Sequence, residues 1–365
     1  MPKLDSPLQL SPVFKPKIWG KRNLEPLYPD FWTTWRGRTV GIRYPHREGL
    51  EGQPIGEVWL TDDEAEFSTG PLAGLKLADA CKQYGEELCG KGATGRFPVL
   101  AKFLFTSDWL SVQVHPDDQY AARRESGSLG KCEMWYIVAA EPDAAFLLGL
   151  KRGVTKPDFA SALEAGKPVG LLNRFSPVPG EAIFVPPGTI HALGPGLTLF
   201  EAEENSDVTY RLNDFGRLGT DGKPRALHLE KGLEITRPEF APLRDLPHLE
   251  FRENYGTRRF VLACSYFAVE EVTLRSIATC AGAREQVEAL TVIAGEGRVE
   301  TSAGWYAYRP GHVWLIPPGV KSYRLVPEEE SRLLKFYVPD LDLDFRQPLA
   351  AGGIPEEQVS RIVFA

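Results

Sequence analysis

Three polar side chains in one short region have the types and spacing of metal ligands. Gln113 and His115 lie in the run Leu-Ser-Val-Gln-Val-His-Pro-Asp-Asp, where they alternate with Val112 and Val114. Because successive strand side chains point to opposite faces, the amide and the imidazole are expected on one face. Glu133 follows 18 residues after His115 and begins a second apolar run. If the two runs pair, its carboxylate joins that face.

A second histidine lies downstream. The run Ala-Ile-Phe-Val-Pro-Pro-Gly-Thr-Ile-His has the form of a strand, a tight turn and a second strand that begins at His191. Two neutral imidazoles, a carboxylate and an amide oxygen suit a borderline divalent metal, with a position left for water or substrate. A single histidine on a barrel strand is more often structural than a ligand. The complete set predicts a metal site at Gln113, His115, Glu133 and His191.

Three more side chains have the chemistry of a sugar-phosphate site. Lys102 interrupts the apolar run 97–105, so its ammonium must reach solvent or meet an anion. Trp19 lies in the basic segment Lys-Ile-Trp-Gly-Lys-Arg, where it either lines a sugar site or packs in the core. Arg211 shares a strand face with Thr209, while Tyr210 points to the other face.

These motifs resemble the zinc-dependent type I mannose-6-phosphate isomerases in their short bacterial form. The similarity runs in the family's order from about residue 17 to residue 217. It includes Ile55-Gly-Glu-Val-Trp, Lys131-Cys-Glu-Met-Trp-Tyr and Asn205-Ser-Asp-Val-Thr-Tyr-Arg. The resemblance implies one zinc ion per chain at the four predicted ligands, an active-site arginine at Arg211, and a hexose 6-phosphate substrate.

The implied reaction interconverts mannose 6-phosphate and fructose 6-phosphate by moving a proton between C2 and C1 through an enediolate. Arg211 would stabilise the negative charge of that intermediate. A base must lie within hydrogen-bond reach, and Lys131, Asp207 and metal-bound water stay open as candidates. The residues expected to contact substrate are Trp19, Lys102 and Ser111. The residues considered for the phosphate group are Lys17, Lys21 and Arg22.

Two alternative functions are compatible with the same side chains. One is an Fe(II) cupin oxygenase, because His/His/Glu sites also suit iron. The other is a non-catalytic sugar-phosphate-binding protein on the same scaffold. The amide ligand and the Ser-Asp-Val-Thr-Tyr-Arg segment count against the oxygenase. Retention of four ligand types together with Arg211 and Lys131 counts against the non-catalytic protein.

Two positions depart from the family's pattern. The family often has proline between the lysine and glutamate at 131 and 133, where this chain has Cys132. It usually reads Glu-x-Gln before the Ser-Asp motif, where this chain has Glu201-Ala-Glu203. An extra carboxylate at Glu203 alters the charge of the site if it faces inward.

Frequent short strands, many glycines and prolines, and only two or three helices predict a mainly β protein built from two cupin-type jelly-roll barrels. Residues 1–35 are expected to be an irregular N-terminal wrap. The expected helices lie within 72–88, 156–166 and 227–235, and a further turn is expected at 171–175. The first domain is placed at 1–237 and carries the metal.

The second domain is placed at 238–365, after a proline-rich linker. It repeats the Pro-Pro-Gly turn in Val313-Trp-Leu-Ile-Pro-Pro-Gly, but Ser322 stands where His191 stood. A looser alignment places Glu288 at the position of Glu133. The second barrel is therefore expected to lack a metal.

The 365 residues have a net charge of −7, which argues against a nucleic-acid surface. Five scattered cysteines without Cys-x-x-Cys spacing predict no disulfide framework and fit a reducing compartment. The N-terminal segment lacks the apolar core of a signal peptide, and no apolar run reaches membrane-spanning length. A cytoplasmic protein is expected, with monomer or dimer left open.

Overall fold

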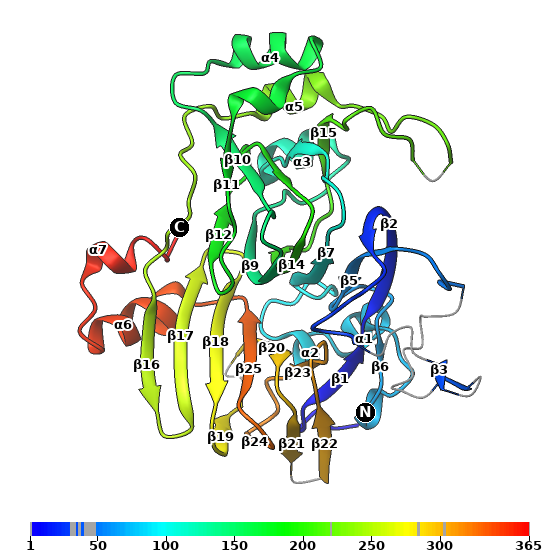
Figure 1. The fold of residues 1–365 in the computed structure, drawn as a ribbon. Helices are drawn as coiled ribbons and strands as arrows, with labels where there is room; N and C mark the ends of the chain where they lie inside the picture. The colour runs from blue at the N-terminus through cyan, green and yellow to red at the C-terminus, as the bar shows by residue number, and fades with distance from the viewer. Residues whose placement is uncertain are drawn as a thin grey trace.

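The computed structural model describes residues 2–29, 34–35, 38–39, 49–219, 221–282, 285–301 and 304–364. The described chain is mainly β, and its strands pair in antiparallel sheets (Figure 1), so the predicted fold class is confirmed. Its α-helices are short: α1 (Leu77–Tyr84), α2 (Glu86–Cys89), α3 (Asp118–Arg124), α4 (Lys156–Glu164), α5 (Leu229–Ile235), α6 (Gln347–Ala351) and α7 (Glu356–Val359).

Two sheets formed by residues before 237 pack against each other through a shared apolar cluster that includes Trp135, Phe146 and Leu193. One sheet has the order β12 (Ala182–Val185), β9 (Glu133–Ala140), β14 (Leu197–Glu204), β7 (Val99–Phe105), β5 (Ile55–Trp59) and β2 (Val13–Lys21). The other has the order β11 (Leu172–Phe175), β10 (Phe146–Leu150), β13 (His191–Leu193), β8 (Val112–Val114) and β15 (Tyr210–Asn213).

Two further sheets are built mostly from residues after 248. The larger has the order β16 (Leu249–Glu253), β17 (Gly256–Ala263), β18 (Ala268–Leu274), β25 (Ser331–Tyr337), β20 (Glu288–Ala294), β23 (Val313–Ile316), β1 (Leu8–Ser11) and β6 (Glu66–Phe67). The smaller has the order β19 (Ala278–Ala281), β24 (Ser322–Pro327), β21 (Gly297–Thr301) and β22 (Gly304–Tyr308). A separate apolar cluster with Trp314 and Leu325 lies between them.

The expected helices form where the local signals lie. In α4, the Thr155 side chain accepts from the Asp158 backbone and Asp158 accepts from the Thr155 backbone, which is a complete capping box. The expected helix within 72–88 is divided at Gly85, whose φ of 46° favours glycine, into α1 and α2. The helix expected at 227–235 is α5.

Two local expectations are wrong. Residues 1–35 contain three strands, β1, β2 and the short β3 (Thr34–Trp35), within the described residues, while 30–33 lie outside them. Pro16 is tolerated because β2 is an edge strand and its register with β5 shifts at that residue. The turn expected at 171–175 is largely β11, which pairs with β10. In both cases the neighbouring strand, which local sequence does not specify, decides the structure.

The two halves of the chain share their largest apolar cluster. It contains Phe103 and Phe200 from the first half and Leu334 and Phe336 from the second, and the rings of Phe200 and Phe336 are 5.5 Å apart. β1 also lies in the large second-half sheet, where it pairs with β23. The boundary near residue 237 and the division into two barrels therefore stay predictions.

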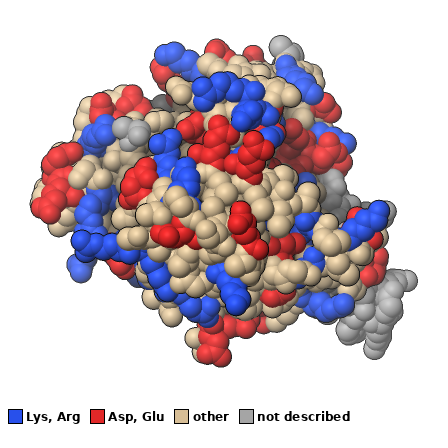
Figure 2. Space-filling view, turned by 90° about the horizontal axis from the view of Figure 1, so that it is seen from above, with Lys and Arg blue, Asp and Glu red and all other residues tan. Residues whose placement is uncertain are grey.

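Charges of both signs are interspersed on the face seen from above (Figure 2). No helix in the described part of the chain has the length and apolar character needed to span a membrane.

Candidate active site and metal centre

The five-stranded sheet brings three of the predicted site residues side by side. Gln113 in β8 lies opposite His191 in β13 on one side and opposite Arg211 in β15 on the other. His115 follows directly after β8. Val112 and Val114 pack in the apolar cluster behind the sheet, so the predicted alternation is confirmed.

Glu133 reaches this group from the facing sheet. It begins β9, which pairs with β12 and β14 and not with β8, so the two runs do not pair directly. The carboxylate nevertheless meets the histidines because the two sheets present their inner faces to each other. Its oxygens lie 3.6 Å from His115 Nε2 and 3.3 Å from His191 Nε2.

The residues fit a divalent metal. His115, Glu133 and His191 are buried and offer ligand atoms that all lie within 4.8 Å of one another. His115 Nδ1 is bonded to the Val208 carbonyl at 2.9 Å and His191 Nδ1 to the Thr189 carbonyl at 3.0 Å. These bonds place the ring protons on Nδ1 and leave both Nε2 atoms as ligands. His115 Nε2 is buried with no hydrogen-bond partner among the described residues.

Gln113 completes the set after a rotation of its amide. Its Nε2 lies 3.1 Å from His191 Nε2, and its Oε1 accepts a hydrogen bond from Ser111 Oγ at 3.1 Å. Turning the amide by 180° exchanges oxygen and nitrogen, which presents the oxygen toward the histidines. The Ser111 oxygen then accepts from the amide nitrogen. Ser111 therefore orients Gln113 in this structure.

Burial sets the charge state of the ligands. It lowers the pKa of His191 to about 4 and, with the nearby Lys131, holds the pKa of His115 well below its usual value. Both imidazoles are therefore neutral near pH 7, as metal ligands must be. Burial also raises the pKa of Glu133 to about 7, although Lys131 opposes this shift. A dication at this position favours the ionised carboxylate.

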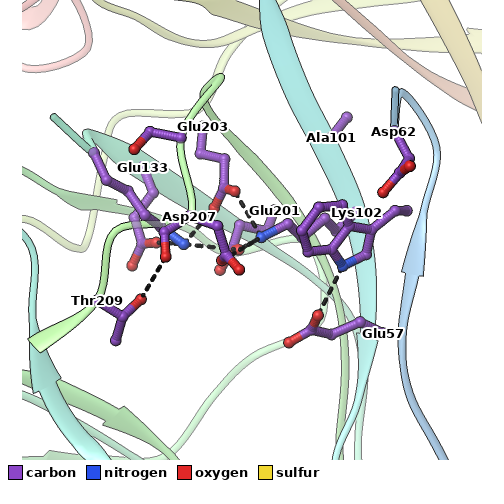
Figure 3. A network of polar contacts seen from close by, with 12 residues as sticks. Glu57, Asp62, Ala101, Lys102, Glu133, Glu201, Glu203, Asp207 and Thr209 are labelled. Carbon is purple, nitrogen blue, oxygen red and sulfur yellow. Dashed lines mark hydrogen bonds and ion pairs between the residues drawn. The ribbon is translucent and has the colours of Figure 1, made fainter. Parts of the chain in front are cut away.

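A second cluster of charges lies beside the metal ligands (Figure 3). Glu203 Oε1 is 2.6 Å from Lys102 Nζ, and Glu203 Oε2 is 2.6 Å from Lys131 Nζ. Lys131 also lies 3.1 Å from Glu133, and both lysines approach Glu201. Although burial lowers it, the pKa of Lys102 is held above its usual value by Glu203 and the other carboxylates. The pKa of Lys131 is likewise held well above its usual value by Glu203, Glu201 and Glu133 against the effect of burial, so both ammonium groups are charged.

Glu203 faces inward, so the departure from the family's pattern does place an additional carboxyl group in the site. Burial raises the pKa of this carboxyl well above its usual value, although Lys102 and Lys131 oppose the shift. Cys132 instead points into the apolar cluster shared by the two halves. Glu201 joins the network as well, and burial is outweighed by Lys131 and Lys102, which lower its pKa to about 2. The sequence indicated that Glu201 and Glu203 share one strand face, because they lie two residues apart. It did not indicate that Glu201 lies opposite Lys102 on the neighbouring strand.

A cavity of about 260 Å³ opens next to these groups. All six residues predicted to act on or contact substrate line it, namely Trp19, Lys102, Ser111, Lys131, Asp207 and Arg211. Trp19 is also part of the apolar cluster between the sheets, so it both packs and lines the cavity. Lys17 lines the cavity too, whereas Lys21 and Arg22 line a different one.

Three further polar lining residues were not predicted as site residues. Glu57 appears in the sequence only within the motif Ile55-Gly-Glu-Val-Trp, and it forms an ion pair with Lys17 at 3.0 Å. Arg225 and His228 come from the polar segment between β15 and α5, which carries no motif. Only the fold brings that segment to the cavity.

Comparisons with known proteins agree with this geometry. A family model described as phosphomannose isomerase type I, catalytic domain, matches residues 8–129. The mannose-6-phosphate isomerase ManA of Bacillus subtilis strain 168 is 34% identical over 319 residues, which is 87% of this chain and 95% of that protein. The chain belongs to the mannose-6-phosphate isomerase family.

Solved structures of this family share the fold. A crystal structure of mannose 6-phosphate isomerase from Bacillus subtilis aligns with a TM-score of 0.79 and 27% identity, covering 91% of this chain and 99% of that one. A zinc-bound mannose 6-phosphate isomerase aligns with a TM-score of 0.68 and 18% identity, over 91% and 99% of the two chains. Members of this family are isomerases, and the chain is therefore an isomerase with a candidate metal site at His115, Glu133 and His191.

Proposed function

We propose that the protein interconverts mannose 6-phosphate and fructose 6-phosphate with one zinc ion per chain. The observation that carries the proposal is the convergence of Gln113, His115, Glu133 and His191 beside a cavity that Arg211 also lines. Family membership supplies the substrate class. Gln113, His115, Glu133 and His191 would hold the zinc ion, which would supply Lewis-acid stabilisation of the negative charge that develops in the reaction.

The chain's own residues supply the rest of the reaction. A base removes the C2 proton of the open-chain aldehyde, and the C–H electron pair forms a C1–C2 double bond while charge collects on O1. Transfer of the O2 proton to O1 and return of the abstracted proton to C1 then give the ketone, with O1 as a hydroxyl and O2 as the carbonyl oxygen. Arg211 lies opposite Gln113 on the neighbouring strand, which supports a role in stabilising the enediolate.

Asp207 and Lys131 stay the side-chain candidates for the base. Asp207 lines the cavity with 57% of its side chain exposed and lies 3.4 Å from Lys102. Lys131 is enclosed by Glu133, Glu201 and Glu203, all within 3.6 Å. This enclosure supports Asp207 as the more accessible proton acceptor. Lys102 is suited to holding the substrate oxygens because its position is fixed by the same carboxylates.

The decisive experiment is a coupled assay. Zinc-loaded protein is incubated with mannose 6-phosphate, and fructose 6-phosphate formation is followed with a reporter enzyme. Turnover that disappears on chelation and returns with zinc supports the proposal. Oxygen consumption by iron-loaded protein would support the oxygenase instead. Binding of mannose 6-phosphate without turnover, in protein with full metal content, would support the non-catalytic alternative.

A further inference from the structure

The charged side chains at and beside the cavity form two groups. At the metal end, Lys102 and Lys131 face four carboxyl groups, which belong to Glu133, Glu201, Glu203 and Asp207. These lysines are therefore compensated by neighbouring acidic groups. At the other end, three arginines gather around one buried carboxylate, and they are Arg211, Arg217 and Arg225 around Asp214. The positive excess therefore lies away from the metal.

The three guanidinium groups differ in how many of their donors the protein uses. Arg217 donates from all three nitrogens, to Asp214, Asp108 and the Trp109 carbonyl. Arg225 donates from Nε at 2.7 Å and from Nη2 to Asp214, and its Nη1 has no hydrogen bond among the described residues. Arg225 lines the cavity and Arg217 does not. Arg225 therefore keeps donors for a ligand.

His228 lines the same cavity as Arg225 and is a neutral donor, because burial lowers the pKa of its imidazole. Nδ1 of His228 accepts a hydrogen bond from the Arg211 backbone N–H at 3.1 Å, which leaves the proton of the neutral ring on Nε2. The His228 backbone N–H also donates to the Arg211 carbonyl at 2.7 Å. These two bonds fix the end of the segment that follows β15 (Figure 1).

The cations near the N-terminal strand are already compensated. Lys17 pairs with Glu57 at 3.0 Å and Lys21 with Glu141 at 2.8 Å. Arg22 lines a different cavity. Lys17 and Lys21 therefore offer no uncompensated charge for a phosphate dianion, and Arg22 does not line the site cavity, although all three were considered from the sequence.

We propose that Arg225, with His228, binds the phosphate group of the substrate at the end of the cavity opposite the metal. The inference rests on the proposed function for the identity of the substrate. The assignment of the residues does not depend on that function. The free guanidinium donors of Arg225 and the imidazole N–H of His228 are suited to the oxygens of a phosphate group. Arg211 lies between this phosphate end and the metal end, beside the carbons that react.

The test uses zinc-loaded Arg225→Gln and the matched control Lys21→Gln. Loss of one charged hydrogen-bonding group should raise the KM for mannose 6-phosphate and the inhibition constant of inorganic phosphate roughly 10- to 100-fold. The kcat should change much less, because the phosphate is bound equally in ground and transition states. Arg225→Lys should recover part of the loss. Lys21→Gln should leave both constants at their original values.

Direct titration with inorganic phosphate separates this inference from the proposed function. If calorimetry shows phosphate binding that is weakened in Arg225→Gln, but no mannose 6-phosphate is turned over, this inference stands and the proposed function fails. If turnover is normal and Arg225→Gln changes neither the KM nor phosphate binding, the inference is overturned. An equal weakening in Lys21→Gln would also overturn it. Should Arg225→Gln fail to fold, the same comparisons apply to Arg225→Lys.

Discussion

At the residue scale, the two histidines present Nε2 to the same point because backbone carbonyls hold their Nδ1 atoms. We expect His115→Ala to lose most of the bound zinc, since one of four ligands disappears and the remaining set becomes less favourable. Elemental analysis of protein purified without chelator measures this. His248→Ala, which replaces an exposed histidine, should keep one equivalent. Full zinc content in His115→Ala would remove it from the ligand set.

Arg211 allows a prediction about the transition state. Its Nη1 donates to the Ala226 carbonyl at 3.1 Å, and its buried Nε has no hydrogen-bond partner among the described residues. Asp214 bonds instead to Arg217 and Arg225. We expect Arg211→Ala to lower kcat by a factor of roughly 100 or more, with zinc content unchanged. Arg211→Lys should recover little because lysine lacks the planar fork.

The alternative role for Arg211 is purely structural. In that case Arg211→Ala would melt at a lower temperature, and its folded, zinc-loaded fraction would turn over at nearly the original rate. Measuring kcat per zinc-loaded molecule distinguishes the two roles.

Glu204 provides a prediction about pH. Burial and the neighbouring Asp118 carboxyl raise the pKa of Glu204 to about 9, whereas an unfolded glutamate titrates near about 4.3. Between these values the folded chain holds a proton that the unfolded chain releases, so stability falls as pH rises. The variant Glu204→Gln has no titrating group at this position, so it does not lose this stability. The difference in unfolding free energy between Glu204→Gln and the original protein should therefore grow in favour of the variant by up to about 1.4 kcal/mol per pH unit.

Urea unfolding at pH 5 and pH 8.5 measures the effect. Glu164→Gln, at an exposed helical glutamate, is the control and should show no such trend. An equal stability difference between Glu204→Gln and the original protein at both pH values would contradict the prediction.

At the scale of elements, pairs of neighbouring strands in the two halves of the chain correspond to each other, with the acidic and the basic residue in exchanged positions. Lys102 in β7 lies opposite Glu201 in β14, and Glu270 in β18 lies opposite Lys335 in β25. Glu133 lies opposite Val185, just before the first Pro-Pro-Gly turn, and Glu288 lies opposite Ile316 before the second. These registers support the alignment of Glu288 with Glu133.

This repeat predicts a structural role for Glu270. Its fully buried carboxylate bonds to Tyr337 at 2.6 Å, pairs with Lys335 at 3.1 Å and contacts Arg258. We expect Glu270→Gln to cost roughly 3 kcal/mol of unfolding free energy, because it leaves Arg258 without its carboxylate partner and Lys335 with only Glu288 at 3.5 Å. Denaturant unfolding measures the cost. Glu253→Gln, at an exposed position of the same sheet, should change stability by less than about 0.5 kcal/mol.

Elements with strong local signals could be predicted from the sequence. Alternation places Gln113 and His115 on one face of β8, and the capping residues Thr155 and Asp158 begin α4. Contacts between distant strands could not be predicted. Glu133 meets the histidines across two facing sheets, and Arg225 reaches the cavity from a segment without a motif. Such contacts depend on how sheets pack, which a local pattern of apolar and polar residues does not encode.

At the scale of the whole molecule, neither half buries its apolar surface alone. Leu8 and Leu10 of β1 lie opposite Leu315 and Val313 of β23. The shared cluster also joins Phe200 to Phe336. A fragment that ends at residue 237 would expose one side of this cluster and lose the partner of β1.

We therefore predict that the full chain unfolds in one cooperative transition, although its sequence suggests two domains. Replacing the fully buried Leu8 by alanine should lower the midpoint of that single transition, because such a change costs about 2–5 kcal/mol. Calorimetry of the full chain and circular dichroism of the fragments 1–237 and 238–365 measure this. Leu343→Ala, at an exposed leucine, is the matched control. Two resolved transitions, with only the first shifted by Leu8→Ala, would show that the halves fold independently and that β1 stabilises only its own half.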